Sequence, residues 1–252
     1  MIFPLSDDDR HLLHPAWMTI SLVALNILVF LLQQLNPELT YAWSVVPYEI
    51  SHNVDLVEPV VIDSGLEIPQ LPGPTPIYLT LLSSMFMHGG WGHLGGNLLY
   101  LWIFGDNVEH RFGALPFLAF YLLSGLAASA AQIMLGPDSV IPNLGASGAI
   151  SGVLGAYLVL FPRNRVNALI FIRIVSVPAA VVLGFWIVFQ LISGSASFSE
   201  IGKSGGVAYA AHIGGFVAGV LAGIACRFIL REEPDTTFRR IYERQPKVKR
   251  YW

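Results

Sequence analysis

Six stretches of the chain are long runs of apolar residues in which charged side chains are rare. They fall at about 16–34, 92–109, 115–135, 147–162, 174–193 and 207–228. A helix needs roughly 20 apolar residues to cross a bilayer, because it rises only about 1.5 Å per residue. The pattern predicts an all-α, polytopic membrane protein with six transmembrane helices, the fourth of which is short.

The polar segments between these runs predict the organisation of the chain. Residues 1–15 form a short N-terminal segment, 16–230 the membrane domain and 231–252 a basic tail. The first loop, 36–77, carries acidic residues but no lysine or arginine, whereas basic residues follow the second and fourth runs and crowd the tail. Because basic loops stay in the cytoplasm, we expect both termini inside and the first loop outside.

Composition supports this interpretation and excludes others. Hydrophobic residues make up 54% of the 252 residues and charged residues only 12%, about half the charged share of a soluble domain. The expected surroundings are therefore a lipid bilayer, and the net charge of −3 predicts no nucleic-acid partner. A single cysteine excludes an intrachain disulfide. No feature predicts an oligomeric state.

A few polar side chains lie inside the predicted spans, where they are costly and suggest function. His93, Ser147 and His212 lie 16, 16 and 15 residues before Glu109, Arg163 and Arg227, which mark the cytoplasmic ends of their spans. At 1.5 Å per residue, all three lie about 22–24 Å above that boundary. The three side chains are thus predicted at one level, below the outer surface.

Small residues next to these positions predict close helix packing. Gly148 and Gly152 are spaced four apart, and His212 shares a helix face with three glycines. Such spacing brings helix backbones together, which could place the Ser147 hydroxyl beside His212 as a nucleophile and base. His93 and Asn97, spaced i, i+4, could donate to an oxyanion.

The same features have simpler explanations. Glycines at this spacing more often serve packing alone, and His93 with Asn97 could be a hydrogen-bonded pair between helices. The shared depth favours the catalytic interpretation. Asp106 lies about 20 Å below His93 along the helix, so a dyad is favoured over a triad. No lysine lies in a predicted span, which argues against an enzyme with a Ser–Lys dyad. The chain has no H-E-x-x-H motif, which argues against a zinc protease. No metal or cofactor is predicted.

At these residues the sequence resembles the rhomboid family of intramembrane serine proteases. The matching motifs are "HGGWGHLGGNLLYLWIFGDNVEHRFG" (88–113), the Gly145-Ala146-Ser147-Gly148 motif and "AHIGGFVAG" (211–219). The resemblance covers roughly 78–230. It implies that Ser147 is the nucleophile and His212 the general base, with His93, Asn97 and the Ser147 backbone N–H as the oxyanion hole. Gly145 would shape the turn before the nucleophile, supported by Gly148. The implied fold is a six-helix rhomboid-like bundle in which the short fourth helix is central. The fifth loop and fifth span would act as a cap and lateral gate.

The resemblance implies hydrolysis of a peptide bond in or beside a transmembrane helix of another membrane protein. The alternative is a rhomboid-like protein that binds and routes membrane proteins without cutting them; such proteins usually lack the serine or the histidine, and this chain keeps both. Two departures stand out. The first loop lacks the arginine of a Trp-Arg pair, and Ser151 replaces a tyrosine that stacks on the histidine in some members. The resemblance therefore does not identify what orients His212.

A prokaryotic plasma membrane is the expected location, because no transit peptide is visible.

Overall fold

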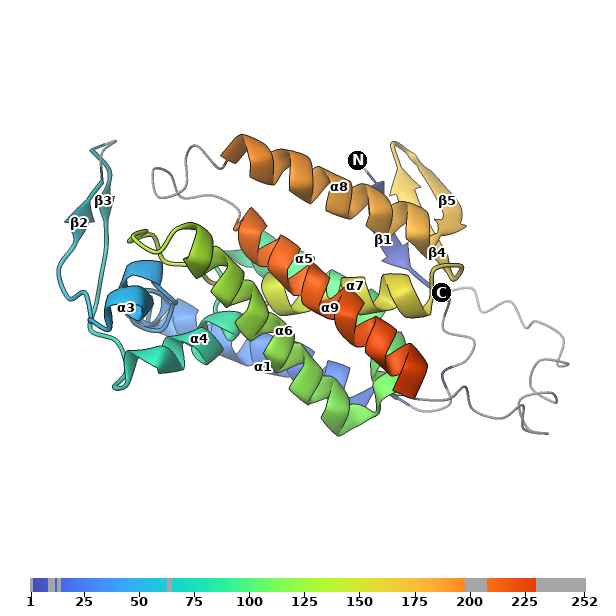
Figure 1. Ribbon diagram of the computed structural model, residues 1–252, viewed down its shortest axis with the longest axis horizontal. Coiled ribbons are helices and arrows are strands. Elements are labelled where there is room, and N and C mark those ends of the chain that lie inside the picture. The colour runs from blue at the N-terminus through green and yellow to red at the C-terminus, as the bar shows by residue number, and fades with distance from the viewer. Residues whose placement is uncertain (1, 9–11, 13–14, 63–64, 198–207, 230–252) are drawn as a thin grey trace, which may run out of the picture.

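The computed structural model describes residues 2–8, 12, 15–62, 65–197 and 208–229, and most of these lie in helices (Figure 1). The long helices are α1 (Trp17–Leu35), α5 (Trp91–Phe112), α6 (Ala114–Leu135), α7 (Ser147–Leu160), α8 (Ala179–Ser197) and α9 (Tyr209–Ile229). Each of the six predicted apolar segments thus contains a helix. The predicted basic tail, 231–252, lies outside the described residues.

Among the described helices, α1, α6 and α9 are long and apolar enough to cross a bilayer. Helix α5 is equally long, but its last two turns carry Asp106, Glu109 and Arg111. Helices α7 and α8 are apolar apart from a few serines and one glutamine, and α7 has only 14 residues. Membrane crossing by α5, α7 and α8 therefore stays a prediction.

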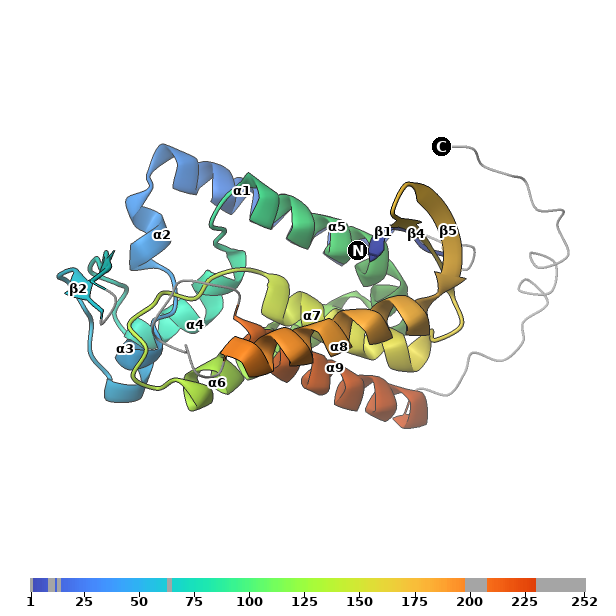
Figure 2. The same ribbon diagram turned by 90° about the horizontal axis from the view of Figure 1, so that it is seen from above.

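Helix α7 lies in the centre of the molecule (Figure 2). All ten residues from 148 to 157 are buried. Leu101 and Phe104 of α5 and Tyr121 of α6 belong to the same core and are fully buried. A helix that is apolar on every side can be surrounded by lipid as well as by protein. The many small residues of this segment fit its central position, because they let other helices approach closely.

Helices α7 and α9 pack backbone against backbone. A Cβ added to Gly215 would collide with the carbonyl oxygen of Gly148, and one added to Gly219 with that of Gly152. No side chain stands between the two helices at these positions. The glycines therefore bring the first turns of α7 and α9 together, which is where Ser147 and His212 lie.

A three-stranded antiparallel sheet corrects the all-α prediction. Strand β1 (Ile2–Ser6) pairs with β4 (Arg165–Ile170), which pairs in turn with β5 (Arg173–Pro178). The fifth predicted span, 174–193, was therefore wrong at its start, because α8 begins only at Ala179. Three of the six residues of β5 are the β-branched Ile174, Val175 and Val177, and hydropathy does not separate such a strand from the start of a helix.

The sheet and the first loop lie at opposite ends of the helices (Figures 1 and 2). Pairing of β1 with β4 joins the N-terminal segment to the residues that follow Arg163. That these two regions share one side of the membrane stays a prediction. Strands β2 (Val60–Val61) and β3 (Glu67–Ile68) pair at the other end.

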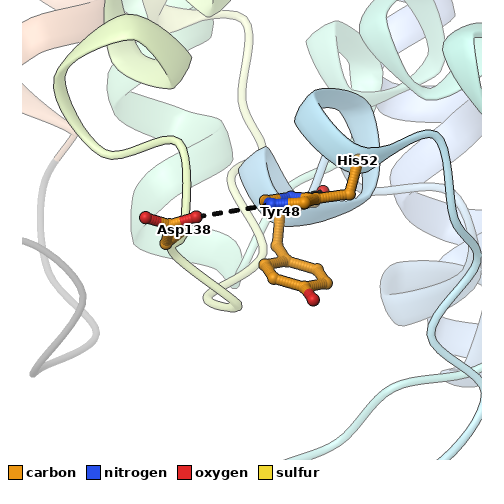
Figure 3. A network of polar contacts seen from close by, with 3 residues as sticks. All are labelled: Tyr48, His52 and Asp138. Atoms are coloured by element: carbon orange, nitrogen blue, oxygen red, sulfur yellow. Dashed lines mark hydrogen bonds and ion pairs between the residues drawn. The ribbon is translucent and has the colours of Figure 1, made fainter.

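The first loop carries helices α2 (Glu38–Ala42) and α3 (Pro47–His52) and continues through the helical turns η1 (Ile77–Leu79), α4 (Thr80–Ser83) and η2 (Ser84–Phe86). It docks on the segment that leads into α7. Val45 and Asn143 exchange backbone hydrogen bonds of 3.1 and 2.8 Å, and the N–H of Tyr48 donates to Ser139. The ring of His52 stacks on that of Tyr48, and its Nε2 atom lies 3.7 Å from Asp138 Oδ1 (Figure 3). Backbone pairing thus holds this loop without the arginine that some relatives use.

Helix α1 begins against the last turns of α5. The buried Glu109 carboxylate accepts hydrogen bonds from the backbone N–H groups of Met18 and Thr19, at 2.9 and 2.7 Å, and from the Thr19 hydroxyl at 2.7 Å. The first N–H groups of a helix lack partners within it. Glu109 therefore acts as a cap supplied by another helix.

Candidate active site

Ser147 is the first residue of α7 and follows a turn that needs glycine. Gly145 has φ of +128°, a conformation that residues with a side chain rarely adopt. Its N–H donates to the carbonyl of Ser84 at 2.8 Å, which fixes the turn to η2. The N–H groups of the first helical turn have no partners within the helix and point toward its start, where the helix dipole also favours negative charge. The start of α7 can therefore hold an anion beside the Ser147 hydroxyl.

His212 meets Ser147 across the contact between α7 and α9. The Nε2 atom of His212 lies 2.8 Å from the Oγ atom of Ser147, within the range of a good hydrogen bond. Both residues are half-buried. His212 lies in the first turn of α9, and its N–H bonds to the carbonyl of Ala208. A hydroxyl and an imidazole at this distance have the geometry of a nucleophile and its base.

His93 and Asn97 approach the same turn from α5. A Cβ added to Gly145 would lie 2.7 Å from His93 Nε2 and 3.6 Å from Ser147 Oγ, so the imidazole packs directly against this backbone. His93 Nδ1 accepts from the N–H of Gly89 at 3.3 Å. A neutral ring that accepts at Nδ1 carries its proton on Nε2, the nitrogen that faces Gly145.

Asn97 lies one turn further along α5 and is 8% exposed. Its Nδ2 atom is buried and has no hydrogen-bond partner among the described residues. A buried donor without a partner is unusual in a folded protein. Such a donor is available to a substrate oxygen.

An open cavity reaches Ser147 from between the first loop, α6 and the start of α9. The space in it that water can occupy is about 40 Å³, more than the ~10–15 Å³ that one water molecule needs. The lining is mainly small or apolar, with the polar side chains of Gln132, Asn143 and Ser147 among it. Gly148 packs on Ala128 of α6 at its floor. Water therefore has a route to the hydroxyl.

The sequence analysis missed two side chains of α8 that contact His212. Gln190 Oε1 lies 2.9 Å from His212 Nδ1, and the ring centroid of Trp186 lies 6.1 Å from that of the imidazole. Gln190 is the one amide in an otherwise apolar span, and this was the signal that could have identified it. Asp106, by contrast, lies at the other end of α5, where its carboxylate accepts from the N–H of Asn107.

Within the described ranges, no three His, Cys, Asp or Glu side chains gather as metal ligands. The polar groups of the site are the hydroxyl, the two imidazoles, the amides and the N–H groups at the start of α7. This combination matches the needs of acyl transfer, which requires a nucleophile, a base and donors for an oxyanion.

Comparison with known proteins identifies the family. The model of the rhomboid domain matches residues 77–228, which is more than half of the chain. The chain belongs to the rhomboid family. Together with the apolar helices, this membership makes it an integral membrane protein.

Curated relatives include proteins named as proteases. The chain is 35% identical over 152 residues to the yeast mitochondrial Rhomboid protein 1, covering 58% of this chain and 41% of that protein. It is 32% identical over 203 residues to Rhomboid protease GluP of Bacillus subtilis, covering 81% and 33%. Rhomboid protease AarA of Providencia stuartii is 29% identical over 241 residues, which cover 88% and 77%. The chain thus matches less than half the length of the first two relatives.

The names of these relatives do not support one compartment. They include bacterial proteases, mitochondrial proteins and a chloroplast rhomboid-like protein of Arabidopsis thaliana. The expected prokaryotic plasma membrane is therefore not supported by the comparisons, although a membrane location is.

Proposed function

We propose that the chain is a serine-type intramembrane endopeptidase that cuts a peptide bond in or next to a transmembrane helix of another membrane protein. The observation that carries this proposal is the 2.8 Å approach of His212 Nε2 to Ser147 Oγ beside an open cavity. Family membership and relatives named as proteases support it. The six helices are proposed to cross the membrane, with α7 as the short fourth span.

The reaction starts at the two helix ends. His212 Nε2 removes the proton from the Ser147 hydroxyl, and Oγ attacks the carbonyl carbon of the substrate. When the tetrahedral intermediate collapses, the peptide C–N bond breaks and His212 passes its proton to the leaving amine. Water from the cavity then attacks the acyl ester with His212 again as base, which releases the new carboxyl end and restores the Ser147 hydroxyl.

Three donors are proposed to hold the oxyanion. The backbone N–H of Ser147 lies in the first turn of α7, His93 Nε2 faces the turn at Gly145, and Asn97 has a buried amide donor without a partner in the described structure. Donors fixed before the reaction need no reorganisation when charge develops. This is the role that the sequence analysis assigned to these residues.

The cavity lining favours a particular kind of substrate. Alanine and glycine residues of α6, α7 and α9 line much of its wall, so residues with small side chains fit beside Ser147. A helical carbonyl is already hydrogen-bonded, and residues that weaken helices, such as glycine or proline, make it available. We therefore propose cleavage next to small residues where a transmembrane helix unwinds near the outer side of the membrane.

Both termini are proposed to lie in the cytoplasm.

A fluorophosphonate probe tests the proposal, because it reacts covalently with an activated serine. Wild-type protein in detergent should be labelled and should cut a transmembrane substrate, whereas Ser147→Ala should do neither. Ser151→Ala is the matched control, since it removes a buried hydroxyl one turn further along α7 and should still be labelled. Asn97→Ala should lose roughly 10²–10³ in rate, the usual cost of one oxyanion donor.

The result also decides against the alternative function. A wild type that binds membrane proteins but is neither labelled nor cuts them would be a rhomboid-like binder, and the protease proposal would be wrong. Mass spectrometry of a cut substrate gives the position of the broken bond.

A further inference from the structure

The side of the His212 ring that faces away from Ser147 contacts α8. Gln190 Oε1 lies 2.9 Å from His212 Nδ1, and Gln190 is only 6% exposed. A carbonyl oxygen can accept a hydrogen bond but not donate one. With the amide in this orientation, Nδ1 carries the ring proton, which leaves the lone pair of Nε2 for the hydroxyl of Ser147 at 2.8 Å.

The opposite arrangement would disable the base. If Nδ1 carried no proton, a neutral ring would carry it on Nε2, and Nε2 would then donate toward Ser147 instead of accepting. A base in this tautomer cannot remove the hydroxyl proton. The acceptor at Nδ1 therefore decides whether the imidazole can act, as the carboxylate does in a serine-protease triad.

A second side chain of α8 contacts the same ring. Trp186 precedes Gln190 by four residues, so both lie on one face of α8. Its ring is tilted by 35° to the imidazole at a centroid distance of 6.1 Å. Among the described residues, the side-chain hydrogen-bond partners of His212 are Gln190 and Ser147. Helix α8 thus supplies both an acceptor for the ring edge and an aromatic neighbour.

We propose that Gln190 is the positioning residue of the Ser147–His212 pair and selects the tautomer in which His212 can act as a base. This inference rests on the proposed protease function. It also explains how a chain with Ser151 in place of the stacking tyrosine orients its histidine. The serine and histidine come from α7 and α9, while the group that prepares the histidine comes from α8, so the site is complete only when α8 is docked against α9.

Two substitutions at Gln190 separate its acceptor from its bulk. Gln190→Met keeps a side chain of similar length but removes the carbonyl oxygen, whereas Gln190→Glu keeps an oxygen that accepts from Nδ1–H. Ile192→Met is the matched control, because it introduces the same residue on the same helix at a position that is 64% exposed. All three are compared with wild type in detergent on a transmembrane substrate.

The kinetic expectation is a change in kcat. Gln190→Met should lower kcat by about 10- to 100-fold, the loss expected when a buried donor loses its partner, and should leave KM within about twofold. Gln190→Glu should keep kcat within about threefold of wild type, and Ile192→Met should match wild type. A Gln190→Met enzyme with wild-type kcat would overturn the inference, as would a loss that Gln190→Glu does not rescue.

Nitrogen NMR of protein with ¹⁵N-labelled histidine reads the tautomer directly. The His212 signals, assigned by their absence in a His212→Gln variant, should show a protonated Nδ1 and an unprotonated Nε2 in wild type. A proton on Nε2 would overturn the inference even if the Gln190 variants failed to fold. If wild type is neither labelled nor active, the protease proposal fails instead, and the spectrum still decides the tautomer.

Discussion

Adding one methyl group to the α7–α9 contact should separate the catalytic pair. A Cβ on Gly219 would lie 1.9 Å from the carbonyl oxygen of Gly152, whereas real Cβ atoms essentially never come within 3.0 Å of another heavy atom. The obstacle is helix backbone, which cannot rotate away as a side chain could. In Gly219→Ala the two helices must therefore move apart by roughly 1 Å at this level.

This displacement reaches the site because Gly219 lies only two turns from His212, about 10 Å along the helix. If α9 moves as a rigid rod, the 2.8 Å distance between His212 Nε2 and Ser147 Oγ grows to about 3.8 Å, beyond a hydrogen bond. A misplacement of about 1 Å costs roughly 10²-fold in rate. Overpacking of this kind also costs about 1–3 kcal/mol of stability.

The assay is the rate of fluorophosphonate labelling and of substrate cleavage, with circular dichroism to confirm folding. Gly223→Ala is a graded comparison: its Cβ would lie 3.1 Å from Ala156 Cα and Val159 Cβ, so we expect less than about a tenfold loss. Gly184→Ala is the neutral control, because nothing lies within 4 Å of its added Cβ. A Gly219→Ala protein that reacts at the wild-type rate would refute the idea that glycine contacts set the Ser–His distance.

Three further predictions concern other contacts. Gly145→Ala should reduce the rate of fluorophosphonate labelling by about tenfold or more. The φ of +128° is strained for alanine, and the new Cβ would lie 2.7 Å from His93 Nε2. Labelling at the wild-type rate would contradict this. Glu109→Gln should lower the Tm in detergent without abolishing labelling, because a neutral amide replaces the carboxylate that caps α1; an unchanged Tm would show that the charge is unimportant. Burial raises the pKa of Glu49, in the first loop, to about 6. A carboxyl whose pKa rises on folding contributes most to stability at a pH below its ordinary pKa of 4.5. This contribution is lost as the pH rises through the folded-state pKa of about 6. Between pH 5 and pH 7.5 the Tm of the wild type in detergent should therefore fall further than that of Glu49→Gln, and equal falls in the two proteins would contradict this.

Hydropathy alone predicted where the long helices lie, because burial in lipid or in the core demands apolar residues in either case. It failed at β5, where residues 174–178 of the strand were taken for the start of a span. It also gave no sign of β1, which pairs with β4 across more than 160 positions of sequence. Pairing between strands so far apart leaves no local pattern in five residues.

The depth of polar residues placed Ser147, His212 and His93 at one level, and the structure brings these three side chains together. The same reasoning did not reach Gln190. Depth along a helix follows from counting residues, but the direction in which a helix turns a single amide depends on how that helix packs. Helix α8 carries no glycine stripe that would have fixed its rotation, so its contact with His212 emerged only from the packed structure.

The three helices that meet at His212 contribute in different ways. Helices α7 and α9 touch through their backbones, so the distance between hydroxyl and imidazole is set by main-chain atoms that cannot adjust. Helix α8 reaches the same imidazole through the Gln190 and Trp186 side chains, and much of its outer face is exposed, including Phe185, Val188, Phe189 and Ile192. A small shift of α8 would therefore break the Nδ1 hydrogen bond while leaving the Ser147–His212 distance unchanged. It follows that a fault in the α7–α9 contact should reduce every reaction of Ser147, whereas a fault in α8 should spare the geometry of the pair and lower the fraction of histidine in the active tautomer.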